Sequence, residues 1–191
     1  MRTLALAAKV GSMDSSDDPS RTIAAARAGD LAAFDLLMRQ HQRLVLATAL
    51  RLLGSLEDAQ DASQEVFLKL YRNLGKLERS DNIPAWLYRV TVNVCHDIGR
   101  KRRATAPVEE AEAVAACDPP DHAGRRRALM LSLRRLSERE RVAVVLRDLE
   151  GLSTGEVARA MGSSEATVRS QISQARVKMR EFLERYFRRR V

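Results

Sequence analysis

The stretch Leu152–Ile172, which reads LSTGEVARAMGSSEATVRSQI, decides the fold of the C-terminal half of this chain. Ser153 followed three residues later by Glu156 is a capping box, which begins a helix. Gly162 suits the left-handed backbone that ends a helix, and Ser163 or Ser164 caps the next one. Two helices joined by a tight glycine turn predict a helix-turn-helix, whose second helix enters the major groove of DNA.

The second of these helices has an apolar and a polar face. Val168 and Ile172 lie on the apolar face by which the two helices pack. The outward positions carry short or polar side chains suited to groove contacts: Ser164, Glu165, Thr167, Arg169, Ser170 and Gln171. An ordinary helical hairpin with a solvated polar face would give the same pattern, because short motif matches recur by chance.

Charge favours the DNA-binding interpretation. The chain carries a net charge of +8, yet residues 1–123 hold 16 basic against 17 acidic residues and residues 124–191 hold 17 against 8. A basic field attracts phosphate backbones independently of sequence. RNA or an acidic membrane surface would also be attracted, but a helix-turn-helix within the basic half favours duplex DNA.

Composition indicates a helix-rich protein with no catalytic chemistry. Apolar residues make up 45%, charged residues 30% and aromatic residues only 4%. Cys95 and Cys117 are far apart, which favours reduced thiols over a redox pair, and His41, His96 and His122 lack metal-ligand spacing. Neither a catalytic triad nor a glycine-rich phosphate loop is present. We therefore expect no enzymatic activity, no cofactor and no metal.

The N-terminus gives no sign of export. Its apolar run is too short for a signal peptide and Lys9 interrupts it; Met13 is an alternative start. Because no apolar run approaches the roughly 20 residues that cross a bilayer, the sequence predicts a cytoplasmic protein without membrane insertion.

The fold class predicted is all-α, with two small helical domains joined by a flexible linker. In the first domain, helices are expected to begin near Leu31, Leu56 and Pro84. Prolines, an acidic cluster and the absence of apolar periodicity mark the linker. The boundaries expected are a disordered lead-in at 1–20, a helical domain at 21–103, the linker at 104–123 and the helix-turn-helix domain at 124–191.

Two helices of the first domain carry polar patterns that a simple repressor does not need. Asp58–Arg72 places carboxylates and Gln64 on successive turns beside Phe67 and Tyr71; this is a docking surface for an arginine-bearing partner or merely a solvated face. The helix from Trp86 combines aromatic side chains, Asn93 and a cationic end, which suits single-stranded or melted DNA.

These patterns together resemble a known family. Asp-x-x-Asp-x-x-Gln-Glu-x-Phe at 58–67, Trp-Leu-Tyr-Arg-x-x-x-Asn-x-x-x-Asp at 86–97, a linker and a basic helix-turn-helix follow one another as in the extracytoplasmic-function group of bacterial sigma factors. The resemblance covers residues 22–103 and 124–183. It implies a factor that binds core RNA polymerase, directs it to promoters and melts the minus-ten element.

The resemblance also implies roles for individual residues. The surface for the clamp helices of the largest polymerase subunit comprises Asp58, Asp61, Gln64, Glu65, Phe67, Leu68 and Arg72. Asn93 would help to capture a flipped base, with the loop Lys76–Ile83 forming part of its pocket and Arg100–Arg103 holding phosphates. The predicted minus-ten contacts are Arg89, Asn93, His96, Asp97, Arg100, Lys101 and Arg102. Minus-thirty-five contacts are Ser164, Glu165, Thr167, Arg169, Ser170, Gln171, Arg176 and Lys178.

Further partners implied by the resemblance are the flap of the second-largest polymerase subunit and an anti-sigma factor. The sequence departs from the family pattern at Gly99, where a larger apolar residue is usual, at Gln171, where an arginine is frequent, and at Asn82-Ile83, where an aromatic residue commonly leads into the tryptophan helix. Two rival hypotheses remain, an autonomous helix-turn-helix repressor or activator and a scaffold whose basic half binds an acidic partner.

Overall fold

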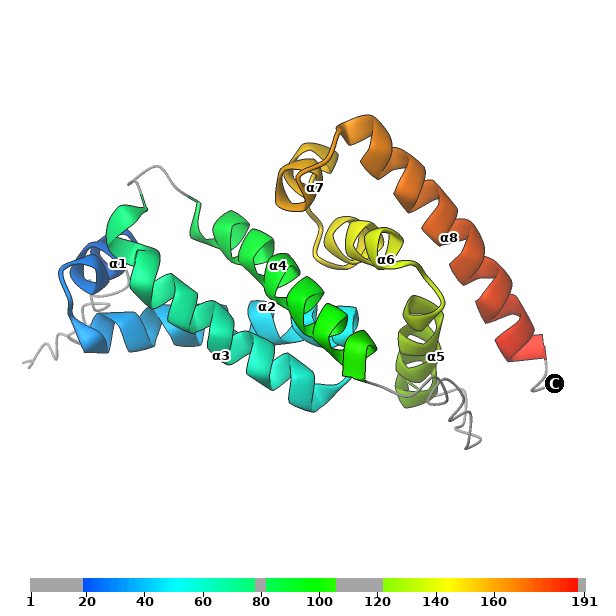
Figure 1. Cartoon of the computed structure of the whole chain (residues 1–191), viewed down its shortest axis with the longest axis horizontal. Coiled ribbons are helices and arrows are strands. Elements are labelled where there is room, and N and C mark those ends of the chain that lie inside the picture. Colours follow the sequence, from blue (N-terminus) through cyan, green and yellow to red (C-terminus); the bar gives the residue numbers. More distant parts are fainter. Residues whose placement is uncertain (1–18, 78–81, 106–121, 189–191) are drawn as a thin grey trace, which may run out of the picture.

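The computed structural model describes residues 19–77, 82–105 and 122–188, which form helices and the turns between them (Figure 1). Over these ranges it contains no strand, so the predicted all-α class is confirmed. In chain order the elements are α1 (Pro19–Arg27), α2 (Leu31–Leu53), α3 (Leu56–Asn73), η1 (Leu74–Lys76), α4 (Ile83–Thr105), α5 (His122–Arg134), α6 (Glu138–Val144), η2 (Val145–Leu149), α7 (Thr154–Met161) and α8 (Glu165–Arg188).

The first half is built on three mutually packed helices, α2, α3 and α4. Asp30 caps α2 by accepting the backbone N–H of Ala32 at 2.9 Å and that of Ala33 at 3.2 Å, and Gly54 ends the same helix at φ 74°. Buried Leu37, Leu70 and Leu87 come one from each helix. Burial of side chains of this size supplies most of the stabilisation of such a bundle.

The N-terminal helix α1 was not foreseen. It begins at Pro19, inside the stretch expected to be disordered, and packs across the end of α2 with Ala26 buried. The rest of that stretch lies outside the described residues. Proline at a first helical position needs no N–H partner, which suits this start.

The second half packs α5, α6 and α7 against the long helix α8. Ser137 with Glu140 and Ser153 with Glu156 form complete capping boxes, and Gly162 adopts the left-handed conformation at φ 59°, so these local predictions are confirmed. After α6 the chain continues as a π-helical turn, η2, which the sequence pattern did not indicate.

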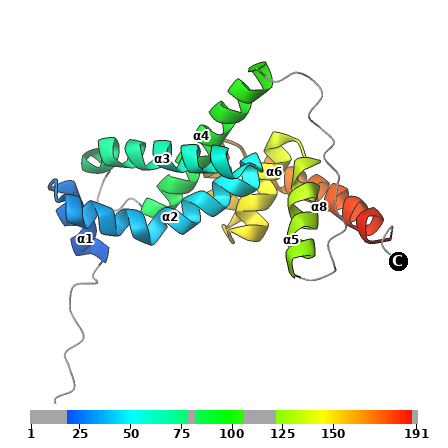
Figure 2. The ribbon, with the colours of Figure 1, turned by 90° about the horizontal axis from the view of Figure 1, so that it is seen from below.

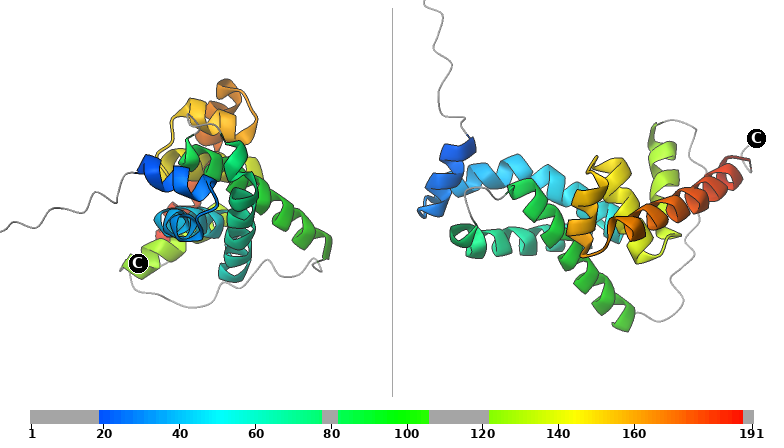
Figure 3. Two further views of the ribbon diagram at one scale, coloured as in Figure 1. Left: turned by 90° about the vertical axis from the view of Figure 1, so that its left-hand side faces the viewer. Right: turned by 90° about the horizontal axis from the view of Figure 1, so that it is seen from above.

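The two halves lie against each other (Figures 2 and 3). Helix α4 packs on α7, and α2 contacts α5, α6 and η2, so one continuous hydrophobic core runs through both halves. Helix α4 extends to Thr105 and α5 begins at His122, two residues inside each end of the predicted linker; its remaining residues lie outside the described part. Among the described helices, none is long and apolar enough to cross a membrane.

Candidate nucleic-acid and polymerase interface

The helix-turn-helix holds its second helix with its polar face outward. The Ser164 hydroxyl accepts the backbone N–H of Thr167 at 3.2 Å and so caps α8, while Val168 and Ile172 are buried against α7. Five of the predicted outward residues are exposed: Ser164, Glu165, Thr167, Arg169 and Ser170. An exposed polar face on the second helix is the arrangement with which a helix-turn-helix enters a major groove.

Two of these residues form a pair. Arg169 donates to the Glu165 carboxylate at 2.7 Å, an exposed i,i+4 contact of little energy. Gln171 is half-buried, and its side-chain oxygen is buried without a hydrogen-bond partner. A position where the family often has an arginine is therefore turned partly into the domain.

Farther along α8, the predicted minus-thirty-five contacts Arg176 and Lys178 face carboxylates of the same domain. Arg176 donates twice to Asp148, at 2.6 and 2.9 Å, and these bonds raise the pKa of its guanidinium further. Lys178 donates to both carboxylate oxygens of Glu140, at 2.7 and 3.0 Å, and Glu140 is only 4% exposed. Both cations hold α8 against α6 and η2.

Helix α4 carries the predicted minus-ten residues along one exposed side. Arg89, Asn93, His96, Arg100 and Lys101 are all exposed. The buried stripe of the same helix includes Leu87, Thr91, Val94 and Cys95, so Asn93 sits in mid-helix with its amide directed away from the core. An exposed amide among cations is an arrangement that can hydrogen-bond an unstacked base.

Acidic groups lie among these cations. Arg100 pairs with Asp97 at 3.3 Å, and Arg102 of α4 donates to Asp58 of α3 at 2.9 Å. The Arg102 pair joins a predicted DNA contact to a predicted polymerase contact. It holds the end of α4 against the beginning of α3 and brings the two predicted surfaces to adjoining positions.

On α3, most predicted polymerase contacts form one exposed face. Asp61, Gln64, Leu68 and Arg72 are exposed, with Glu65 half-buried beside Lys69. Phe67 differs, because it is only 7% exposed and belongs to the core. The exposed aromatic residue of this helix is instead Tyr71, which packs edge-on against Phe34 with ring centroids 5.1 Å apart.

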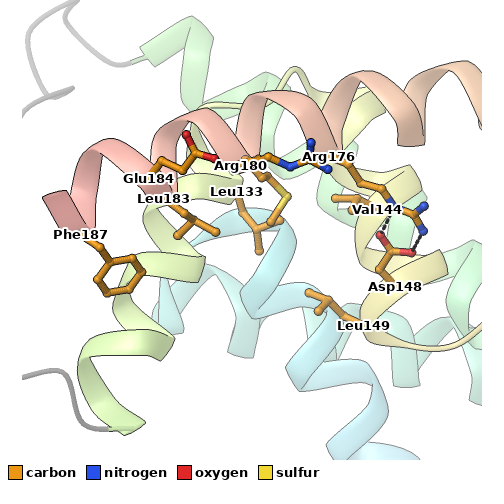
Figure 4. A pocket seen from close by; sticks show the side chains of 10 residues that line it. Leu133, Val144, Asp148, Leu149, Arg176, Arg180, Leu183, Glu184 and Phe187 are labelled. Atoms are coloured by element: carbon orange, nitrogen blue, oxygen red, sulfur yellow. Dashed lines mark hydrogen bonds and ion pairs between the residues drawn. The ribbon is translucent and has the colours of Figure 1, made fainter.

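A groove on the second half was missed by the sequence interpretation. It has a volume of about 570 Å³ and lies between α5, η2 and the C-terminal half of α8 (Figure 4). Its apolar lining is Leu133, Val144, Leu149, Met179, Leu183 and Phe187. The spacing 179, 183 and 187 is an i, i+4, i+8 stripe, a signal that was available in the sequence.

The described residues hold no cluster of three or more histidine, cysteine or carboxylate side chains that could bind a metal ion. Cys95 is buried in α4, and burial, together with the carboxylate of Glu138, raises the pKa of its thiol to about 12. The thiol is thus neutral and unreactive around neutral pH.

Comparison with known protein families decides the identity of the chain. The Sigma-70 region 2 model matches residues 37–105, and the Sigma-70 region 4 model matches residues 126–179. SigM of Mycobacterium tuberculosis, an ECF RNA polymerase sigma factor, is 36% identical over 163 residues, covering 84% of this chain and 82% of SigM. The chain is an extracytoplasmic-function RNA polymerase sigma factor. It belongs to the family that directs RNA polymerase to promoters.

Other relatives agree with this assignment. The ECF sigma-E factor of Escherichia coli is 31% identical over 163 residues, covering 78% of this sigma factor and 85% of its relative. The solved structure of CnrH in complex with the cytosolic domain of CnrY is similar, with a TM-score of 0.66 and 28% identity over 87% of this chain and 98% of that chain. RpoE of Bartonella quintana, solved with the anti-sigma factor NepR, has the same fold, with a TM-score of 0.67 at 24% identity over 79% and 96% of the two chains.

The matched regions correspond to the two halves of the fold. Region 2 spans α2 to α4 and therefore holds Asn93 and the exposed face of α3, whereas region 4 holds the helix-turn-helix and much of the apolar groove. The autonomous repressor is not favoured, since relatives of one function align over both halves.

Proposed function

We propose that this sigma factor binds core RNA polymerase in the cytoplasm, melts the minus-ten element with α4 and reads the minus-thirty-five element with the N-terminal turns of α8. The observation that carries the proposal is Asn93, an exposed amide in mid-helix beside Arg89 and Arg100. The energy for melting comes from binding unpaired bases better than duplex. The sigma factor itself catalyses nothing; RNA synthesis remains the work of polymerase.

The exposed face of α3 supports a contact with the clamp helices of the largest subunit. Asp61, Gln64 and Arg72 offer charge and hydrogen bonds, while Leu68 is 49% exposed and supplies apolar area. Charged and polar groups around an apolar centre are typical of a specific protein interface. In this proposal Phe67 acts indirectly: it packs in the core and supports α3, the helix that carries these exposed side chains.

On region 4, the apolar groove is suited to an amphipathic segment such as the flap of the second-largest subunit. Leu183 and Phe187 of α8 form one wall, and Leu133 and Leu149 lie opposite (Figure 4). Met179 of α8 also lines the groove. A groove of this composition binds the apolar face of a helix. The N-terminal turns of α8 remain exposed at the other end of the helix, so DNA and flap can bind region 4 together.

Anti-sigma control is proposed by likeness to the relatives. The solved structure of RpoE contains the anti-sigma factor NepR, and that of CnrH contains the cytosolic domain of CnrY. A partner that covers the α3 face or the region 4 groove would prevent polymerase binding. Arg176 and Lys178 remain proposed minus-thirty-five contacts, for which DNA competes with Asp148 and Glu140.

The test separates polymerase binding from melting. Purified sigma factor is expected to co-elute with core polymerase and to support transcription from its promoter. Asn93→Ala should reduce open-complex formation, measured by permanganate reactivity of unpaired thymines, by at least 10-fold while leaving co-elution unchanged. Asp61→Ala serves as the matched variant, for which co-elution should weaken first. Equal loss of both activities in Asn93→Ala would contradict the base-capturing role.

A further inference from the structure

Regions 2 and 4 are joined by specific side-chain bonds that neither promoter reading nor polymerase binding requires. At their centre is Glu150, between η2 and α7. Its carboxylate forms an ion pair with Arg51 of α2 and accepts the hydroxyl of Tyr88 of α4 at 3.1 Å. The Glu150 side chain is 10% exposed and that of Arg51 is 32% exposed. Three helical elements therefore meet at one partly buried charge pair.

A second set of bonds closes the C-terminal end of α2. Arg141 of region 4 donates to the backbone oxygen of Leu52 at 2.8 Å, and Arg134 donates to that of Gly54 at 2.7 Å. The final carbonyls of a helix lack intrahelical partners and carry partial negative charge. Arginines from the other region supply both the missing donors and the positive charge.

Arg141 is held ready for this contact. Its guanidinium also donates to the backbone oxygens of Leu133 at 2.9 Å and Leu136 at 3.1 Å, both within region 4. The side chain is thereby fixed in the orientation that meets α2. Because a preorganised group loses little entropy on binding, this contact favours closure of the two regions.

We infer that the free sigma factor holds itself in a closed, promoter-incompetent state, with Glu150 as the latch between Arg51 and Tyr88. The inference rests on the proposed function, in which regions 2 and 4 read two elements of one promoter. The bonds that hold the two regions together are made by residues of this chain, so closure needs no anti-sigma factor. Binding to polymerase would then have to pull the two regions apart.

The distance between the two promoter elements explains why the closed state is promoter-incompetent. The minus-ten and minus-thirty-five elements are about 25 base pairs apart, or roughly 85 Å of B-form duplex at about 3.4 Å per step. In the closed state α4 packs directly on α7, the first helix of the helix-turn-helix. Regions in direct contact cannot sit on two elements separated by such a length, so the closed state engages one element at most.

Closure uses a face of α4 that adjoins the face proposed to read DNA. Tyr88, Val92 and Cys95 face region 4, where the last two line a cavity of about 340 Å³ together with Glu138 and Val142. Of the proposed DNA contacts, His96 and Arg102 also line this cavity, and His96 lies 3.8 Å from the carboxylate of Glu138. Arg89, Asn93 and Arg100 lie on the exposed side of the helix. Latch variants can therefore be made without touching the DNA-reading or polymerase-binding residues.

Cys95 provides a direct reporter of opening. In a Cys117→Ser background it is the only thiol of the chain, and in the closed state it is 5% exposed. We would measure the rate of Cys95 labelling by a maleimide at pH 7.5 and the radius of gyration by small-angle X-ray scattering. Glu150→Arg, which sets two cations against each other, should label at least 10-fold faster and have a larger radius of gyration.

Three further variants make the result decisive. Glu181→Arg, on the exposed part of α8, makes the same charge change away from the seam and should behave as the parent protein. The charge exchange Arg51→Glu with Glu150→Arg should restore slow labelling. If Glu150→Arg fails to fold by circular dichroism, Arg51→Gln takes its place, with labelling at least 3-fold faster. Parent protein that already labels as fast as a short cysteine peptide would overturn the closed state.

A separate measurement tests whether closure inhibits transcription by the sigma factor. If closure keeps most of the free sigma factor out of the open state that polymerase uses, its apparent affinity for core polymerase is reduced in proportion to the open fraction. Glu150→Arg should then need at least 3-fold less sigma factor than Glu181→Arg for half-maximal transcription by core polymerase. If both variants need the same concentration of sigma factor although Glu150→Arg labels faster, closure does not inhibit transcription. Failure of the proposed function would look different, with no transcription from any variant while labelling still separated Glu150→Arg from its control.

Discussion

Lys178→Met tests whether Lys178 is first a structural residue or a DNA contact. The family resemblance implies that it contacts the minus-thirty-five element, whereas in the structure its ammonium donates to both oxygens of a carboxylate that is 4% exposed. Methionine keeps much of the apolar stem and removes only the charge. The variant therefore leaves Glu140 ionised and largely buried, with only Ser137 as a remaining partner.

Removing one partner of a buried pair costs about 3–5 kcal/mol. Because the Lys178 side chain is 51% exposed, water replaces part of the lost interaction. We therefore expect a loss of about 2–3 kcal/mol. For chains of this size about 1 kcal/mol shifts Tm by roughly 2–4 °C, so thermal unfolding at pH 7.5 should occur roughly 5–10 °C lower. Glu140→Gln with Lys178→Met should recover most of this loss, since glutamine also completes a capping box.

The pH dependence identifies the charge as the cause. Burial alone raises the pKa of Glu140, but the hydrogen bonds from Lys178 and Ser137 outweigh it and hold the pKa below its ordinary value. A carboxyl with a lowered folded-state pKa stabilises the fold above its unfolded pKa, and this stability is lost as pH falls through the folded value. Without the Lys178 ammonium the pKa of Glu140 rises. In the variant this carboxyl therefore becomes protonated, and its destabilising buried charge is removed, at a higher pH than in the parent protein. The Tm difference should narrow between about pH 7 and about pH 4. An unchanged Tm at pH 7.5 with weakened minus-thirty-five binding would refute the structural role.

Two further predictions concern single side chains. Arg169→Ala should weaken binding to minus-thirty-five duplex by about 1–3 kcal/mol if Arg169 contacts a base edge, measured by fluorescence anisotropy at fixed salt; unchanged affinity would assign the side chain to solvent. Thr91→Val should raise the free energy of unfolding by about 1 kcal/mol in urea titrations, since the Thr91 hydroxyl is buried without a hydrogen-bond partner; a destabilised variant would mean that this hydroxyl is satisfied.

Local features of this fold were predictable because each depends on a few neighbouring residues. The capping boxes at Ser137 and Ser153 and the left-handed Gly162 follow from spacing alone. The burial of Phe67, in contrast, could not be predicted from spacing alone. A narrow apolar stripe would leave it outside, but α3 packs on both α2 and α4 and needs a wider buried face.

Long-range pairings were beyond prediction. In the sequence Arg176 and Lys178 had no evident partner other than DNA, yet the carboxylates with which they pair lie 28 and 38 residues away along the chain. Glu150 is 99 residues from Arg51 and 62 from Tyr88. No periodicity records which charges meet across such separations, so the sequence pattern did not indicate that the two halves share one hydrophobic core.

The chemistry of the seam suits a contact that must open. Between regions 2 and 4 the individually identifiable bonds are polar ones, made by Arg51, Tyr88, Arg134, Arg141 and Glu150. Each of these groups regains hydrogen bonds to water when the regions separate, whereas a wholly apolar interface would expose its surface at full cost. Apolar side chains of both regions also meet in the continuous core, so separation exposes apolar surface as well. In the closed state that we infer, the specific polar bonds define how the two regions meet, and water can replace these bonds when polymerase binds.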